Sequence, residues 1–198
     1  MKLKESERQK VIDSVVAMNK GPRMLKLYMD ICAKCGTCAS QCHIAQSDPS
    51  VHTNPARRAD HLRKILKRYG TLSGKVLGSL SPNGKLDIDI DRWAKDFYDC
   101  TGCRRCAQFC PFGIDNSIIT RKGRAIVHSL GKTPFKVAET QRISDEYGND
   151  EGMSFEAFME NVKFLESEML EETGVEIKIP VGKEKADVLF VPASADLI

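Results

Sequence analysis

Apolar residues recur at helical spacing in several stretches of the chain, so the sequence predicts a mainly α-helical fold. The first predicted helix ends at Gly21-Pro22, and its apolar face consists of Val11, Ile12, Val15, Val16 and Met18. The segment from Met24 to Met29 fits either a short strand or a helical turn. A polar stretch rich in Ser, Asp, Pro and Asn, from Gln46 to Pro55, predicts a loop.

The central part of the chain carries the strongest helical patterns. A helix is predicted from Arg57 to Tyr69, with Gly70 as its C-cap and with Leu62, Ile65, Leu66 and Tyr69 on one face. The Gly/Ser-rich passage 71–84 predicts one short helical turn around Val76 and Leu80, and its SPNG sequence predicts a turn. Two more helices follow, one with Ile90, Trp93, Ala94 and Phe97 inward, the other at 116–130 with Ile118, Ile119, Ile126, Val127 and Leu130 inward.

Two residues bear on how these last two helices are arranged. The helix of Trp93 and Phe97 leads directly into Cys100, and Gly123 weakens the expectation that the 116–130 helix is continuous.

After residues 131–152, which have turn signals and little pattern, a helix is predicted to begin at the N-cap Ser154 and to end at Gly174. Its apolar face consists of Phe155, Phe158, Val162, Leu165 and Met169.

The C-terminal pattern changes from helical to alternating. Val175, Ile177, Ile179 and Val181 alternate with polar residues, and 186–191 has the composition of a buried strand. Such strands have no partner sheet in this chain, so they would pair with another subunit or begin a truncated α/β domain. The expected organisation is an N-terminal helix at 1–24, a core domain at 25–135, and a short α/β extension at 136–198.

Composition places the chain among ordinary globular proteins. Of its 198 residues, 41% are hydrophobic and 29% are charged, and the net charge of +3 gives no argument for nucleic acid. The charged N-terminus does not resemble a signal peptide, and no apolar run approaches the roughly 20 residues of a membrane span. We therefore expect a cytoplasmic protein whose membrane association would come through a partner, with cysteines serving as metal ligands rather than disulfides.

All eight cysteines fall in two runs with the same C-x-x-C-x-x-C-x-x-x-C spacing. This is the spacing of bacterial ferredoxins that hold two [4Fe–4S] clusters, and Pro111 adds the proline that follows the last cysteine there. Three closely spaced cysteines let the backbone curl around one cube. The expected metal ligands are Cys32, Cys35, Cys38, Cys42, Cys100, Cys103, Cys106 and Cys110.

The fourth cysteine of each run is expected to reach across to the other cluster, as it does in two-cluster ferredoxins. One cluster would then be held by Cys32, Cys35, Cys38 and Cys110. The second would be held by Cys42, Cys100, Cys103 and Cys106. Because this crossed ligation joins distant segments, cluster assembly and folding should be coupled.

Three other chemistries compete with this interpretation. Two Cys₄ zinc sites suit paired C-x-x-C units, although zinc sites rarely repeat this four-cysteine spacing. A disulfide framework is disfavoured without a signal peptide, and a redox C-x-x-C pair would leave six cysteines without a role. No phosphate loop, His-Glu zinc motif or Ser/His/Asp pattern is present, so no catalytic residue and no self-contained catalytic site are predicted.

Several residues near the cysteines have two interpretations. Arg104 and Arg105 would raise a reduction potential or attract an acidic partner, or else be solvated without a role. His43 would donate a hydrogen bond to a cluster sulfur or simply be exposed. Trp93 is expected in the core rather than as an electron relay. Solvation is favoured over a docking patch for the basic helix face of Arg57, Arg58, Arg63, Lys64, Lys67 and Arg68.

The separation of the two runs, filled by helices, resembles the α-helical ferredoxin domains of heterodisulfide reductase C-type subunits and of succinate dehydrogenase iron–sulfur subunits. The phrases YMDICAKCGTCASQCH, LRKILKRYGTLSGKVLGSL, FYDCTGCRRCAQFCPFGID and ADVLFVPASADLI look closer still to D-type heterodisulfide reductases and to the K subunit of the sulfite-reduction-associated Dsr membrane complex. The resemblance implies a dicluster α-helical ferredoxin domain.

One departure from these relatives concerns catalysis. Full-length members of the closer group, the D-type reductases and the K subunit, continue into cysteine-rich CCG domains, whose noncubane cluster reduces disulfide or trisulfide substrates. This chain has no adjacent cysteine pair. The resemblance therefore implies an electron relay in anaerobic respiration, from a quinol-oxidising membrane cytochrome b or a flavoprotein toward a CCG-domain partner. The first alternative is a fragment of the catalytic subunit of that oxidoreductase. The second, from a different class, is a structural zinc-binding interaction module.

Overall fold

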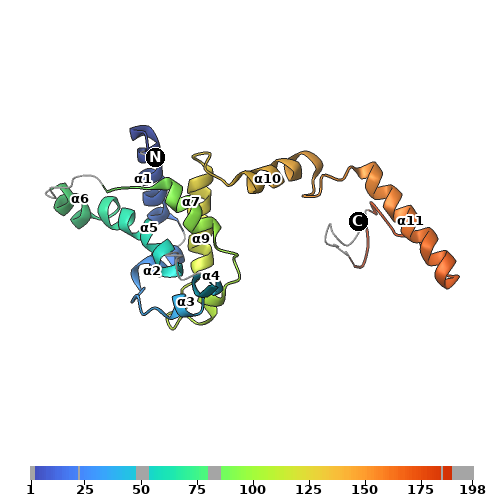
Figure 1. Cartoon of the computed structure of the whole chain (residues 1–198), viewed down its shortest axis with the longest axis horizontal. Helices are drawn as coiled ribbons and strands as arrows, with labels where there is room; N and C mark the ends of the chain where they lie inside the picture. The colour runs from blue at the N-terminus through green and yellow to red at the C-terminus, as the bar shows by residue number, and fades with distance from the viewer. Residues whose placement is uncertain (1–2, 22, 48–53, 80–85, 184, 189–198) are drawn as a thin grey trace. The chain divides into compact units, whose positions relative to one another are not determined.

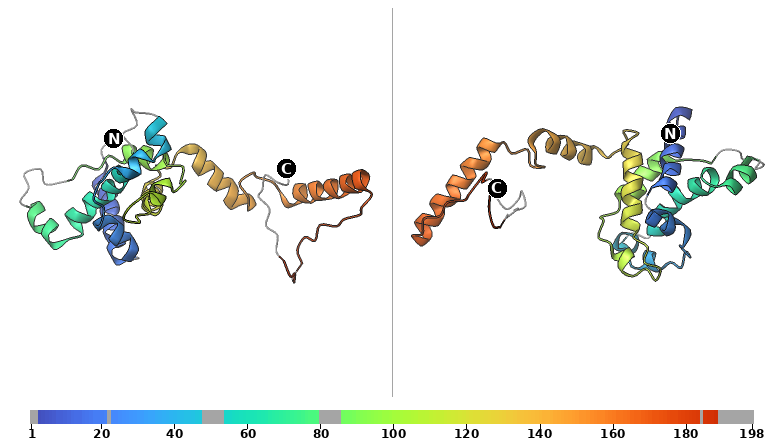
Figure 2. Two further views of the ribbon diagram at one scale, coloured as in Figure 1. Left: turned by 90° about the horizontal axis from the view of Figure 1, so that it is seen from below. Right: turned by 180° about the vertical axis from the view of Figure 1, so that it is seen from behind.

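The computed structural model describes residues 3–21, 23–47, 54–79, 86–183 and 185–188 (Figures 1 and 2). By its internal contacts the chain divides into two compact units, Met1–Pro134 and Phe135–Ile198. Every regular element within the described residues is a helix, which confirms the mainly α-helical fold.

The first unit begins with α1 (Glu5–Ala17), a 3-10 turn η1 (Met18–Lys20), and α2 (Arg23–Asp30). The predicted N-terminal helix is confirmed, and the segment around Met24 is helical rather than extended. Together these elements bury Val11, Ile12, Val15, Leu25 and Met29. Because α1 packs against α5 (Pro55–Tyr69), its apolar face closes one side of the core.

Helix α5 is the centre of the first unit and contacts α1, α6 (Leu72–Ser79), α7 (Ile90–Tyr98) and α9 (Asn116–His128) (Figure 1). Its start is set by Asn54, whose Oδ1 accepts a hydrogen bond from the Arg57 backbone N–H at 2.9 Å, and by Pro55 in the first turn. The predicted apolar face is confirmed by the burial of Leu62, Ile65 and Leu66. The helix therefore starts and packs as its sequence indicates.

The basic residues of α5 do not all face solvent, so that prediction was wrong for two of them. Arg58 is 2% exposed and Arg63 is 5% exposed. The Arg63 Nε donates to the Met29 carbonyl oxygen at 2.7 Å, and its Nη1 pairs with Asp60. Charge alone placed these arginines outside, whereas the neighbours that cover α5 come from distant parts of the chain.

The first unit also contains α6 (Leu72–Ser79), α7 (Ile90–Tyr98) and α9 (Asn116–His128), besides the short helices α3 (Thr37–Ser40), α4 (His43–Ser47) and α8 (Arg105–Gln108). The first three confirm the predicted short helix in 71–84 and the two helices that follow it. The SPNG turn and most of the predicted Gln46–Pro55 loop lie outside the described residues.

Helices α7 and α9 pack against each other at a glycine. A Cβ added at Gly123 would lie 2.2 Å from an atom of the Phe97 ring, so α9 approaches α7 more closely than any side chain would allow. Phe97 is fully buried, and Trp93, 4% exposed, meets it edge to face at a centroid distance of 5.9 Å. Trp93 is thus a core residue, as expected, and Gly123 leaves α9 unbroken.

The second unit contains α10 (Phe135–Tyr147) and α11 (Phe155–Thr173). Helix α10 falls in a region where the sequence has little apolar pattern and indicated no helix, and no residue of α10 is buried. Its surface instead carries ion pairs one turn apart, from Arg142 to Glu139 at 2.9 Å and to Glu146 at 2.5 Å.

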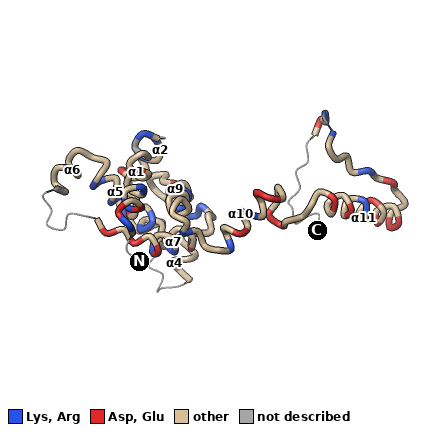
Figure 3. Tube along the Cα trace, turned by 90° about the horizontal axis from the view of Figure 1, so that it is seen from above, with Lys and Arg blue, Asp and Glu red and all other residues tan. Residues whose placement is uncertain are grey.

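Helix α11 has the predicted ends. The Ser154 side chain caps its start by accepting the Ala157 N–H at 3.3 Å, and Gly174 ends it with a left-handed φ of 70°. Acidic residues lie along the length of the helix (Figure 3). Val162 is its one buried residue, whereas Phe155 and Phe164 are exposed, so the apolar face packs on little within the described part of its unit.

The predicted C-terminal strands do not form in the described residues, and the α/β extension is corrected accordingly. Residues 175–181 have no regular secondary structure, and Val175, Ile177, Ile179 and Val181 stay exposed. The predicted strand at 186–191 lies largely outside the described residues. A strand needs a neighbour for its backbone N–H and C=O groups, and the part of the chain that the structure describes contains no other strand to supply one.

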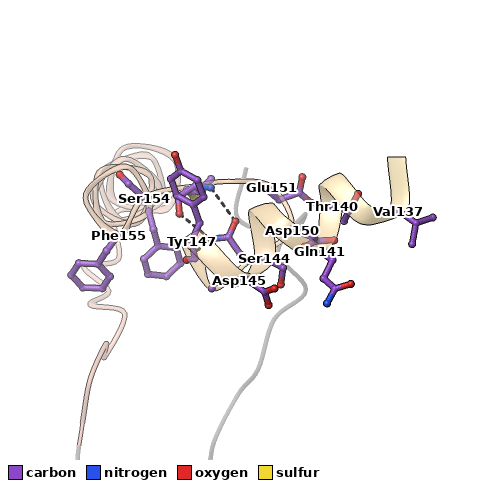
Figure 4. A pocket seen from close by; sticks show the side chains of 14 residues that line it. Val137, Thr140, Gln141, Ser144, Asp145, Tyr147, Asp150, Glu151, Ser154 and Phe155 are labelled. Atoms are coloured by element: carbon purple, nitrogen blue, oxygen red, sulfur yellow. Dashed lines mark hydrogen bonds between the residues drawn. The ribbon is translucent and has the colours of Figure 1, made fainter. Parts of the chain in front are cut away.

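An open groove separates the end of α10 from the start of α11 (Figure 4). The turn between the helices is held by Asn149, whose Nδ2 donates to the Met153 carbonyl at 2.8 Å and whose Oδ1 accepts the Met153 N–H at 3.0 Å. Tyr147 and Phe155 line the groove and are 46% and 66% exposed. The groove contains no cysteine.

Candidate iron–sulfur cluster sites

The two cysteine runs fold into the same turn. The third residue of each run has a positive φ, 56° at Lys34 and 75° at Gly102. The fifth residue does as well, 86° at Gly36 and 61° at Arg104. Each run then enters a one-turn helix, α3 (Thr37–Ser40) or α8 (Arg105–Gln108).

The hydrogen bonds of the two turns also correspond. The Ala39 N–H donates to the Gly36 carbonyl at 2.8 Å, and the Ala107 N–H donates to the Arg104 carbonyl at 2.9 Å. Left-handed residues within such a turn rotate successive N–H groups toward one side, which creates a concavity suited to an anion. The two runs therefore share a backbone geometry as well as a spacing.

Arg104 holds a left-handed conformation that glycine adopts at lower cost, which gives a stability prediction. We expect Arg104→Gly to be more stable than Arg104→Ala by about 1 kcal/mol, because a Cβ is disfavoured at positive φ. Both variants lose the ion pair of Arg104 with Asp115, 2.9 Å long, so the comparison isolates the backbone. Anaerobic denaturant titrations of the two variants measure the difference, and equal midpoints would contradict it.

The structure brings the eight cysteines together around two cavities. One is lined by Cys32, Cys35, Cys38 and Cys110. The other is lined by Cys42, Cys100, Cys103 and Cys106. Each cavity thus takes three cysteines from one run and the fourth from the other, and the contact of α3 with α8 brings the two runs side by side.

Two helix N-termini border both cavities. The first turn of α5 contributes Ala56 to the first cavity and Arg58 to the second. The first turn of α9 contributes Asn116 to the first cavity and Ser117 to the second. Unpaired N–H groups and the helix dipole favour negative charge at such ends, as a cluster with four thiolates carries. Sequence reasoning missed these four residues, although the caps Asn54 and Asp115 mark both helix starts.

The wall of the second cavity contains a buried cation. The Nε and Nη1 atoms of Arg58 are buried and have no hydrogen-bond partner among the described residues. A guanidinium stays protonated in proteins, and burying it without an anion is unfavourable. A cluster with four thiolates supplies that anion, so the residues of this cavity fit a [4Fe–4S] group.

The cysteine thiols differ in their surroundings. Burial raises the pKa of the Cys106 thiol to about 11, against the opposing effect of the Arg58 guanidinium. Burial also raises the pKa of Cys38. At the exposed Cys35, a hydrogen bond from the Thr37 hydroxyl lowers the pKa of the thiol. Burial therefore disfavours the charged thiolate at Cys106 and Cys38, and the positive charge of bound iron would offset that cost.

The structure also places the three residues near the cysteines for which the sequence left two interpretations open: His43, Arg104 and Arg105. The Nδ1 of His43 lies 3.7 Å from the Cys103 sulfur while its ring stays exposed, so the histidine is both exposed and beside a ligand. Arg104 is not merely solvated, because it pairs with the Asp115 carboxylate that caps α9. Arg105 lines the second cavity and is exposed.

Comparison with known proteins identifies the type of cofactor. Residues 28–114 match the 4Fe-4S dicluster domain, a span that contains all eight cysteines and confirms two [4Fe–4S] clusters as the cofactors. The chain is 32% identical over 198 residues to the Hdr-like menaquinol oxidoreductase iron-sulfur subunit of Archaeoglobus profundus. It is 31% identical over 199 residues to the Hdr-like menaquinol oxidoreductase iron-sulfur subunit 2 of Archaeoglobus fulgidus.

These alignments cover 98% and 99% of this chain but 35% and 36% of the relatives, so the chain spans about a third of their length. No solved structure matches it significantly. Among the described residues, no helix combines the length and apolar character needed to cross a membrane.

Proposed function

Because the chain carries a 4Fe-4S dicluster domain and is similar along nearly its whole length to iron–sulfur subunits of Hdr-like menaquinol oxidoreductases, we propose that it relays single electrons within such an oxidoreductase. Each bound cluster supplies a centre that accepts and releases one electron. The observation that carries the proposal is the pair of neighbouring cavities, each lined by four cysteines.

The ligation we propose is crossed. Cys110 joins the first three cysteines of the first run, Cys32, Cys35 and Cys38. Conversely, Cys42 joins Cys100, Cys103 and Cys106. The lining of the two cavities supports this assignment, since each fourth cysteine lies at the cavity of the other run.

Exposed residues of the cavities suggest where electrons enter and leave. Cys35 and Cys103 are exposed, whereas Cys42 and Cys106 are each 8% exposed. Phe112, 45% exposed, lines the first cavity next to these ligands. A redox partner that docks over either exposed cysteine would come close to one cluster, so we place the donor and acceptor surfaces there.

The finer proposal concerns the partners. The relatives' names specify menaquinol, so the donor we propose is a quinol-oxidising membrane cytochrome b, with a flavoprotein as the alternative donor. The acceptor would be a disulfide- or trisulfide-reducing CCG-domain site outside residues 1–198. Association with the membrane would follow from the cytochrome partner.

Anaerobic purification tests the cofactor content that this function requires. We expect a brown protein with about eight irons and about eight acid-labile sulfides per chain. In an EPR-monitored redox titration, each cluster should take up one electron reversibly. A colourless zinc protein, or clusters that decompose on reduction, would contradict the relay.

A further inference from the structure

Within the described residues of the first unit, one buried charge is not neutralised by its protein surroundings. Among the described residues, the buried Asp96 pairs with His61 at 2.6 Å, and the buried Asp115 pairs with Arg104 at 2.9 Å. Arg63 pairs with Asp60. Arg58, 2% exposed, has neither an ion pair nor a hydrogen bond at Nε and Nη1 within the described residues.

The position of Arg58 indicates what it faces. It lines the second cavity together with Cys42, Cys100, Cys103 and Cys106, and no carboxylate is among the described residues of that lining. A guanidinium cannot release its proton to reduce the cost of burial. The anion that balances it must therefore enter the cavity with the cofactor.

A cluster with four thiolates meets this requirement in both redox states. Four thiolates around the oxidised core leave a net charge of about −2, and reduction by one electron makes it about −3. A nearby cation favours the more negative, reduced form. Hydrogen bonds donated to cluster sulfurs have the same effect, so both contributions of Arg58 raise the reduction potential.

Among the described residues that line it, the first cavity has no counterpart of Arg58. The residues that the first turns of α5 and α9 contribute to this cavity are Ala56 and Asn116, and both are uncharged. Its lining cation is Lys34, whose side chain is 59% exposed and pairs with Asp60 at 3.0 Å. The two clusters therefore share backbone geometry and ligand type but differ in buried charge.

We propose that Arg58 donates N–H groups to the sulfurs of the cluster held at the second cavity and makes that cluster the higher-potential member of the pair. An electron shared by the two clusters would then reside mainly on the second cluster. This difference in reduction potential sets the direction of transfer, from the first cavity to the second. This inference rests on the proposed electron-relay function and adds the order of the two clusters.

Replacement of Arg58 by methionine, which keeps length but removes charge and donors, tests the proposal. An EPR-monitored titration of the holoprotein should show the second cluster at lower potential by at least the equivalent of a tenfold change in its equilibrium, about 59 mV. The first cluster should move much less. Arg57→Met is the matched control, because Arg57 is on the same turn of α5 but does not line either cysteine cavity.

A spectroscopic readout covers the case in which Arg58→Met fails to hold its cluster. In the wild-type holoprotein labelled with guanidino-¹⁵N arginine, pulsed EPR of the reduced second cluster should show ¹⁵N coupling. The coupling should disappear in Arg58→Lys and persist in Arg104→Lys. Absence of coupling in the wild type, or an unchanged potential in Arg58→Met, would overturn the role of Arg58 while leaving the relay intact. Absence of clusters from the wild type would instead contradict the relay itself.

Discussion

Replacement of Cys110 by serine is expected to alter the cluster bound by Cys32, Cys35 and Cys38, although Cys110 belongs to the other cysteine run. A serine oxygen is a poor substitute for a thiolate, so that cluster should be lost or converted to a three-iron form. The iron content should fall from about eight toward seven or about four per chain. Iron analysis and EPR of the anaerobically purified protein measure the change.

The reciprocal variant gives a matched control. Cys42→Ser should alter the cluster at the second cavity, because Cys42 lines that cavity. Cys35→Ser and Cys103→Ser supply reference spectra, since each replaces a cysteine from the first three of its run. The spectrum of Cys110→Ser should match that of Cys35→Ser, and the spectrum of Cys42→Ser should match that of Cys103→Ser. The opposite pairing would show that each run binds its own cluster.

Replacement of Gly123 by alanine is expected to destabilise the first unit, even though alanine is the better helix former. The new Cβ would lie 2.2 Å from the Phe97 ring, and Phe97 is fully buried, so the ring has no free space to enter. Overpacking of this kind costs about 3 kcal/mol, while alanine in place of helical glycine returns about 1 kcal/mol. The net loss of about 2 kcal/mol should lower the apparent melting temperature by roughly 5–10 °C.

A second substitution shows whether the clash is the cause. If it is, Phe97→Leu should cost less in the Gly123→Ala background than in the wild type, because the smaller side chain relieves the overpacking. Thermal melts of the four proteins under anaerobic conditions, scanned at one rate, measure this coupling. Strictly additive losses would show that Phe97 and Gly123 do not interact as the structure indicates.

Features that depend on neighbouring residues in the chain could be predicted from the sequence. The spacing of the cysteines indicated two clusters, because three cysteines separated by two residues each let the backbone curl around one centre. Helices α1, α5, α7, α9 and α11 followed from apolar periodicity, and Ser154 and Gly174 marked the ends of α11 because caps are local hydrogen bonds. Helix α10 was not predicted, because no residue of it is buried and the ion pairs on its surface do not produce an apolar pattern.

Features that depend on distant segments required the tertiary structure. The burial of Arg58 and Arg63 could not be inferred from α5, because the groups that cover them belong to other elements. Gly123 looked like a weakness in its helix, yet its role depends on the Phe97 ring of α7. The alternating residues 175–181 suggested a strand, but alternation specifies only a preferred backbone and cannot supply the neighbouring strand that would bond to it.

The two cysteine runs show where local and long-range information divide. Their spacing identifies the cofactor, because it sets how the backbone wraps around a cluster. Which helix ends and which charges surround each cluster depends on how α5 and α9 pack against the two runs. The same ligand pattern thus yields two unequal sites, since Arg58 borders one cavity and Ala56 the other.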